Sequence, residues 1–210
     1  MSRFLEVLNE FAGEEGGGGV ALTPACFPKV AAAVCERLSA QEAHVSAEFT
    51  YFIRKLAPVT KAPGLMDYRV RFESVSSGRG GGEDFVMTVS APATSLCPCS
   101  KEISQYGAHN QRCRIEASVR ITERVWIEEI VAYLERAASN PVFAVLKRPD
   151  EKWVTEKAYE NPKFVEDIVR DLALLLEADD RISWYSINSE NFESIHNHNA
   201  YAQLTRDKRQ

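Results

Sequence analysis

Hydrophobic and polar residues alternate along several stretches of the chain, and this period of two predicts strands. In the first half, the alternation covers residues 43–56 and, less strictly, residues 68–75. A turn region at 58–64 separates these two runs, so we expect an antiparallel hairpin. In the second half, strand-like runs cover residues 84–93, 113–122, 184–188 and 200–205.

Apolar residues at helical spacing predict helices in the segments around these strands. Two such segments, 2–11 and 25–39, precede the first strand. Two more, 126–139 and 161–178, lie between the strand pairs of the second half. The polar segment 147–151, which comes before the last of these helices, is expected to be a loop.

A glycine-rich segment at 76–82 separates two groups of elements, and we place a module boundary there. The first module, residues 1–77, is predicted to run helix, helix, strand, strand. The second, residues 83–210, is predicted to run strand, strand, helix, helix, strand, strand. The halves match if the first lacks an opening pair of strands. Gly16–Gly19 is expected to be a flexible break; no Lys-Ser or Lys-Thr follows it, so it is not a phosphate-binding loop.

Composition narrows the class of protein. The chain has 210 residues, of which 45% are hydrophobic, enough for a sizeable core. Its net charge of −5, with acidic and basic residues mixed, argues against a nucleic-acid-binding surface. No apolar run approaches the ~18 residues of a membrane span. The five cysteines are odd in number, so a disulfide framework is not expected, and a reducing cytoplasm fits better.

The segment 95–114 concentrates residues capable of chemistry between two predicted strands. It holds Cys97, Cys99 and His109, and Pro98 stiffens the spacer between the thiols. Loops held by rigid elements often carry functional residues. However, C-x-C is not the C-x-x-C of zinc ribbons, and no second cysteine pair follows at the spacing of a structural zinc site. From spacing alone, buried inert cysteines and a metal site both remain open.

The wider sequence around these residues resembles a known family. The strings Ser-Leu-Cys-Pro-Cys-Ser-Lys at 95–101 and Gly-Ala-His-Asn-Gln-Arg at 107–112 closely resemble the signature of type IB GTP cyclohydrolases. Two later blocks, 148–166 and 188–200, are also similar to that family. The resemblance implies an α+β tunnelling fold of tandem modules, each with two strands, two helices and two strands. It also implies that the first module here lacks its opening strands.

The resemblance implies one divalent ion at each site. Cys97 and His109 match two of the family's metal ligands, and Glu151 matches the third. A catalytic zinc site takes three protein ligands and leaves one position for water. A carboxylate ligand also suits harder ions, so we expect zinc or manganese. Without the resemblance, Glu151 would be interpreted as an exposed loop carboxylate.

Other site residues follow from the same alignment of motifs. Glu193 is expected to bind the guanine edge, because a carboxylate accepts two hydrogens in bidentate fashion. His196 is expected to act as the general acid and base, since its ordinary pKa of ~6.5 suits proton transfer near neutral pH. Cys99 is assigned a supporting catalytic role. Glu166 matches a further site carboxylate, although its predicted helix leaves a structural role open, and His198 is taken as structural.

The implied reaction converts GTP and water to 7,8-dihydroneopterin triphosphate and formate, the entry to tetrahydrofolate and related pterins. The triphosphate needs basic groups, and five flank the expected site: Lys101, Arg112, Arg114, Lys147 and Arg148. The family resemblance also implies a homo-oligomer, expected to be a tetramer, with active sites between subunits. Two alternatives remain: a tunnelling-fold nitrile reductase with Cys97 or Cys99 as nucleophile, and a zinc-binding module without turnover.

Overall fold

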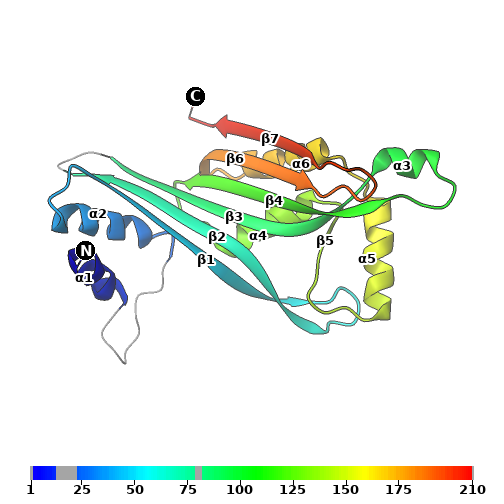
Figure 1. Ribbon diagram of the computed structural model, residues 1–210, viewed down its shortest axis with the longest axis horizontal. Helices are drawn as coiled ribbons and strands as arrows, with labels where there is room; N and C mark the ends of the chain where they lie inside the picture. Colours follow the sequence, from blue (N-terminus) through cyan, green and yellow to red (C-terminus); the bar gives the residue numbers. More distant parts are fainter. Residues whose placement is uncertain (1, 13–22, 79–81, 210) are drawn as a thin grey trace.

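A computed structural model describes residues 2–12, 23–78 and 82–209 of the chain. In these residues a single antiparallel sheet of seven strands carries helices on one face (Figure 1). The strand order is β1-β2-β3-β4-β6-β7, and the short β5 pairs with β3. The strands are β1 (Glu42–Leu56), β2 (Pro63–Ser77), β3 (Glu83–Leu96), β4 (Asn110–Ile121), β5 (Asn140–Pro141), β6 (Ile182–Asn191) and β7 (Ala200–Asp207).

The helices differ in how they meet this sheet. The described residues form α1 (Ser2–Ala12), α2 (Phe27–Arg37), α3 (Pro98–Ile103), α4 (Ile127–Ala137), α5 (Arg148–Glu160) and α6 (Val165–Glu177). Of these, α2, α4 and α6 pack against the strands, whereas α5 stands at the end of the sheet (Figure 1). None of the described helices is long and apolar enough to cross a membrane.

The core lies between the sheet and its helices. Phe72 of β2 is fully buried, and the ring of Phe27 from α2 meets it edge to face with centroids 5.6 Å apart. Ile130 of α4 and Leu172 of α6 are also fully buried in the same cluster. Burying one such side chain contributes roughly 1.5–3 kcal/mol. This packing fixes the sheet that positions the loops at its ends.

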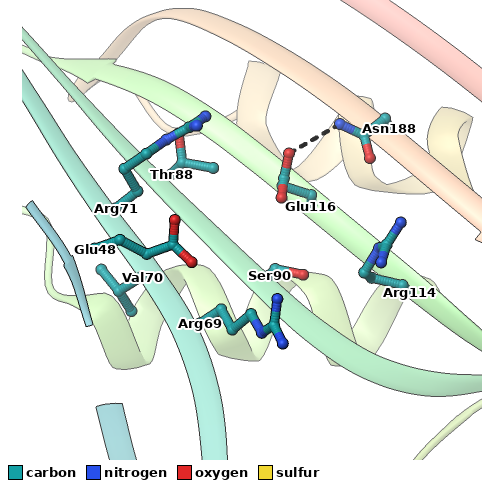
Figure 2. A pocket seen from close by; sticks show the side chains of 9 residues that line it. All are labelled: Glu48, Arg69, Val70, Arg71, Thr88, Ser90, Arg114, Glu116 and Asn188. Atoms are coloured by element: carbon teal, nitrogen blue, oxygen red, sulfur yellow. Dashed lines mark hydrogen bonds between the residues drawn. The ribbon is translucent and has the colours of Figure 1, made fainter. Parts of the chain in front are cut away.

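The opposite face of the sheet is polar, as the alternation predicts. A cavity of about 270 Å³ lies on this face, and residues of β1, β2, β3, β4 and β6 line it. Figure 2 shows the side chains of these residues. Arg69 and Arg71 lie on either side of the buried Val70 along β2, which illustrates the period of two. The amide of Asn188 donates to the Glu116 carboxylate across 3.1 Å.

The predicted strands and the hairpin are confirmed. β1 and β2 pair in an antiparallel register that places Phe49 opposite Val70. β2 starts earlier than predicted, at Pro63, and β4 starts at Asn110. β2 pairs with β3 across the predicted boundary, so both predicted modules contribute strands to one sheet; the module division itself stays a prediction. The glycine break at 16–19 and the linker residues 79–81 lie outside the described residues.

The expectation of a polar loop at 147–151 is wrong, because α5 begins at Arg148. Pro149 suits the first turn of a helix, where its missing N–H is not needed. The N–H of Lys147 donates to the carboxylate of Asp150 across 2.9 Å, which caps this end. α5 has few apolar residues and hence no stripe for the periodicity to detect. The last helix consequently begins at Val165 rather than at residue 161.

Asp150 also joins α5 to the β1–β2 hairpin. Its side chain is fully buried, and its Oδ1 accepts from the N–H groups of Val59 and Thr60, each across 2.8 Å. Its Oδ2 accepts from the Thr60 hydroxyl across 2.6 Å. Burial raises the pKa of Asp150, but the hydrogen bonds from Thr60, Lys147 and Val59 outweigh it, so the pKa lies below its ordinary range.

We expect Asp150→Ala to destabilise the protein at pH 7 and to matter less at pH 3. A carboxylate whose pKa is lowered on folding stabilises the folded state above its ordinary pKa of ~3.9, and this contribution fades as pH falls below that value. Denaturant unfolding at both pH values measures the difference. Asp180→Ala, which removes an exposed aspartate, is the matched control. Equal losses for Asp150→Ala at pH 7 and pH 3 would contradict this account.

Candidate active site

A cavity of about 260 Å³ lies where β3 ends and β4 begins. Three parts of the chain form its wall: the β3–β4 connection, the start of α6 and the β6–β7 connection. The wall includes most of the site residues predicted from the sequence, namely Cys97, His109, Glu166, Glu193 and His196. The fold therefore brings residues as far apart in the sequence as Ser95 and Ala200, about half the chain, to the same cavity.

The backbone holds Cys97 and His109 together. The N–H of Cys97 donates to the carbonyl of His109 across 3.1 Å, which continues the β3–β4 pairing by one step. Between them α3 folds the connection back, and Gly107 turns the chain with a φ of 120°, a value that favours glycine. The hydroxyl of Ser100 accepts from the His109 N–H across 3.1 Å. The side chains of Cys97 and His109, the two expected ligands, are thus held at a half-buried rim.

Behind His109 lies a buried group of polar side chains. His109 Nδ1 is 2.8 Å from Gln111 Oε1 and 3.5 Å from the Ser194 hydroxyl. Gln111 Nε2 lies 3.5 Å from Ser95 Oγ, and Asn191 Nδ2 donates to the same oxygen across 3.0 Å. The network leaves the other imidazole nitrogen, Nε2, without a hydrogen-bond partner among the described residues.

The β6–β7 connection supplies another part of the cavity wall. Glu193 is half-buried there, whereas His196 is exposed. The imidazole rings of His196 and His198 stack with centroids 5.2 Å apart, and both line the cavity. Glu166 lies in the first turn of α6 and also lines it. Two carboxylates and two imidazoles therefore line the same cavity as the Cys97–His109 pair.

Two predicted site residues lie elsewhere in the single chain. Glu151 is exposed on the first turn of α5, next to the Asp150 contact with the hairpin, and does not line the cavity. Cys99 is exposed on α3 and does not line it either. Within the described part of the chain, no three His, Cys, Asp or Glu residues are grouped closely enough to hold a metal ion. One chain thus brings together two of the three expected ligands.

A family model described as "Type I GTP cyclohydrolase folE2" matches residues 1–202. The chain belongs to this FolE2 family. A GTP cyclohydrolase FolE2 from Magnetococcus marinus is 56% identical over 202 residues, covering 96% of this chain and 73% of the relative. Its counterpart from Syntrophobacter fumaroxidans is 54% identical and covers 99% of this chain and 78% of the relative.

Solved structures with little sequence similarity share the fold of this FolE2-family chain. Uricase from Arthrobacter globiformis matches with a TM-score of 0.55 at 12% identity, covering 98% of this chain and 75% of that one. A mutant urate oxidase from Bacillus sp. TB-90 matches with a TM-score of 0.57 at 8% identity, covering 98% and 76%. These are tunnelling-fold proteins, so the expected fold is confirmed.

The basic residues that flank the FolE2 motifs fall into separate places. Lys101 donates to the Tyr159 carbonyl across 2.6 Å. Lys147 and Arg148 lie at the start of α5, beside the β1–β2 hairpin. Arg112 and Arg114 line a cavity of about 370 Å³ on the polar face of the sheet, together with Arg69 and Phe192. None of these residues lines the cavity that holds Cys97 and His109.

Sequence reasoning missed four polar residues that line this cavity: Ser95, Gln111, Lys163 and Asn191. Two of them carried a usable signal. Ser95 precedes Cys97 by two residues, and Gln111 follows His109 by two. Residues two apart on a strand point to the same side, so both were candidates for the same cavity. Lys163 and Asn191 come from distant segments and left no comparable pattern.

Proposed function

We propose that this protein is a type IB GTP cyclohydrolase that converts GTP and water to 7,8-dihydroneopterin triphosphate and formate. This reaction is the first step toward tetrahydrofolate and related pterins. The observation that carries the proposal is a single cavity, in a chain of the FolE2 family, whose wall includes Cys97, His109, Glu193 and His196.

The donor atoms of the cavity suit one zinc or manganese ion. A thiolate from Cys97 and an imidazole nitrogen from His109 are preferred zinc ligands. The contact of His109 Nδ1 with Gln111 leaves Nε2 as the metal-binding nitrogen. When bound, such a cation acts as a Lewis acid and lowers the pKa of a coordinated water, to ~7 in favourable sites.

The remaining residues bind the base and move protons. The Glu193 carboxylate accepts from the N1–H and the exocyclic amine of guanine, which orients C8 toward the Cys97 and His109 side. Water adds to C8, and His196 donates a proton to the imidazole nitrogen of the base as the C8–N bond breaks. A second water releases C8 as formate, and the ribose carbons then rearrange and close the new ring with loss of one water. Glu166 and Cys99 are proposed to assist, Glu166 from within the cavity and Cys99 from α3 beside it.

We propose that Glu151 of a neighbouring copy completes the ligand set in a homo-oligomer, expected to be a tetramer. Glu151 is exposed and outside the cavity of its own chain, whereas Cys97 and His109 lie at its rim. In the described part of the chain, β1 and β7 are the outer strands of the sheet. Unpaired strand edges favour association with another sheet. The oligomer therefore supplies both a partner for the edges and a third ligand.

Mixing two inactive variants tests this arrangement. Cys97→Ala and Glu151→Ala are each expected to be inactive alone. Assembled together at random, they should regain about a quarter of the wild-type activity, because that share of sites receives both intact ligands from different subunits. A mixture of Cys97→Ala with His109→Ala is the control, since both lesions affect the same side of the site and no site is repaired. Mixed oligomers without any recovered activity would place Glu151 in the same subunit as Cys97.

Glu193→Gln is expected to lower kcat/KM for GTP by about 10- to 100-fold, since a hydrogen bond to a charged group contributes roughly 1.5–3 kcal/mol. The glutamine side chain keeps the shape of the glutamate. However, its NH₂ group is a donor and would face the N1–H and amine donors of guanine, so one hydrogen bond is lost. Bound metal should stay at the wild-type amount. Glu102→Gln changes an exposed carboxylate on α3, outside the cavity, and should have little effect. A Glu193→Gln enzyme with wild-type kcat/KM would remove the assignment.

Incubation of the purified protein with GTP and Mn²⁺ tests the proposed reaction as a whole. We expect release of one formate per GTP consumed and appearance of a fluorescent pterin after oxidation. Chelation of the metal should stop both. Absence of formate from protein that has bound its metal would contradict the proposal, as would consumption of a reduced nicotinamide cofactor in place of GTP.

A further inference from the structure

The hydrogen-bond directions behind His109 can be traced from one backbone carbonyl. Ser95 is fully buried, and its Oγ lies 2.9 Å from the carbonyl oxygen of Lys163. A carbonyl only accepts, so the Ser95 hydroxyl must donate its single hydrogen to it. Every other polar contact of Ser95 Oγ is therefore one in which that oxygen accepts.

Two side-chain amides meet this acceptor. Asn191 approaches Ser95 Oγ to 3.0 Å and Gln111 to 3.5 Å. Both must present their NH₂ groups, because an amide oxygen would face the lone pairs of the hydroxyl. Gln111 then has its Oε1 turned the other way, 2.8 Å from His109 Nδ1. An amide oxygen also only accepts, so Nδ1 must carry a hydrogen.

A neutral imidazole carries one hydrogen, which leaves the lone pair on Nε2. We infer that Ser95 and Gln111 are positioning residues that hold His109 as the Nδ1–H tautomer and so keep its Nε2 lone pair available to a divalent cation in the cavity. The consequence for metal binding rests on the proposed function. The tautomer itself rests only on the hydrogen bonds of this chain.

These directions leave one buried acceptor unpaired. With its NH₂ group toward Ser95, Asn191 has its Oδ1 buried and without a hydrogen-bond partner among the described residues. Only 2% of the Asn191 surface is exposed, so this acceptor is also shielded from bulk water. Buried polar atoms in native proteins are normally satisfied, and an exception calls for an explanation. Here the hydrogen bond from the Asn191 NH₂ group to Ser95 Oγ determines which end of the amide is left unpaired.

The tautomer can be measured in the metal-free protein by NMR of the full chain labelled with ¹⁵N-histidine. The chain has four histidines, and His109→Ala identifies the signal of interest. About two pH units above the ordinary histidine pKa of ~6.5, the imidazole is neutral. We expect hydrogen on Nδ1 of His109 in the wild type, a shift toward the Nε2–H tautomer in Gln111→Leu, and retention of Nδ1–H in Gln111→Glu, which keeps an acceptor.

Metal affinity gives the second readout, by competition with a chelator for Zn²⁺. Gln111→Leu should bind about 10- to 100-fold more weakly, the usual effect of removing the partner of a metal-binding histidine. Gln111→Glu should stay within a few-fold of the wild type, and so should Gln203→Leu, which changes an exposed glutamine on β7. Ser95→Ala frees Gln111 to reverse its amide and should give mixed tautomers, so it tests the inference if Gln111→Leu does not fold.

Wild-type His109 with its hydrogen on Nε2 would overturn the inference, as would variants of Gln111 and Ser95 that leave the tautomer unchanged. These outcomes are distinct from failure of the proposed function. A wild-type chain that binds no divalent ion would contradict the proposed metal site, whereas the NMR measurement on metal-free protein decides the hydrogen-bond directions by itself.

Discussion

Cys97→Ala is expected to abolish metal-dependent release of formate from GTP, with a loss of at least about a thousandfold. A bound cation contributes several kcal/mol of transition-state stabilisation, and each ~1.4 kcal/mol corresponds to a factor of ten in rate. The variant loses the only thiol that lines the cavity within the described residues. Measurement of metal content after dialysis, together with formate release, should show that both are lost.

Cys35→Ala is the matched control for this prediction. Cys35 is buried in α2, in a small cluster with Val7, Val30 and Val34, away from the cavity. Its removal leaves a small void and should lower stability modestly, while metal content and turnover stay at wild-type values. A Cys97→Ala protein that keeps its metal and its turnover would eliminate Cys97 as a ligand.

His196→Ala is expected to lower kcat by about 10²- to 10⁴-fold, the usual contribution of a positioned general acid and base. The metal should remain bound, since His196 is not among the proposed ligands and comes from the β6–β7 connection, whereas Cys97 comes from the β3–β4 connection. This combination, lost turnover with retained metal, separates proton transfer from ligation. Steady-state kinetics and metal analysis on the same preparation measure both quantities.

His198→Ala provides the comparison for His196→Ala. The two rings stack and line the same cavity, so loss of either removes similar surface. If His196 transfers the proton and His198 only supports it, His198→Ala should cost far less in kcat. Equal losses in both variants, or loss of metal from His196→Ala, would contradict the assigned role.

The strands could be predicted because one face of the sheet packs against helices and the other is polar. Val70 and Phe72 are buried, whereas Arg69 and Arg71, which alternate with them along β2, are exposed, and this contrast is visible in the sequence. The helix α5 could not be predicted in the same way. It lacks an apolar stripe, and its first turn depends on contacts of Asp150 with Thr60, 90 residues away.

The site was predictable in part for a related reason. Cys97 and His109 close a connection between two paired strands, so their proximity follows from local sequence. Glu193 and His196 were assigned by family resemblance, and the structure places them on the same cavity. The supporting role of Ser95 was not predictable, because the carbonyl that orients it belongs to Lys163, 68 residues away. The position of Glu151 likewise depends on how α5 stands relative to the sheet.

Anomalous diffraction from crystals of the zinc-loaded protein tests the central claim most directly. We predict a peak in the cavity about 2.3 Å from Cys97 Sγ and about 2.0–2.1 Å from His109 Nε2, the usual lengths of such bonds. The peak should face Glu193 and His196 across the cavity. A zinc ion bound elsewhere, or bound to His109 through Nδ1, would contradict this account.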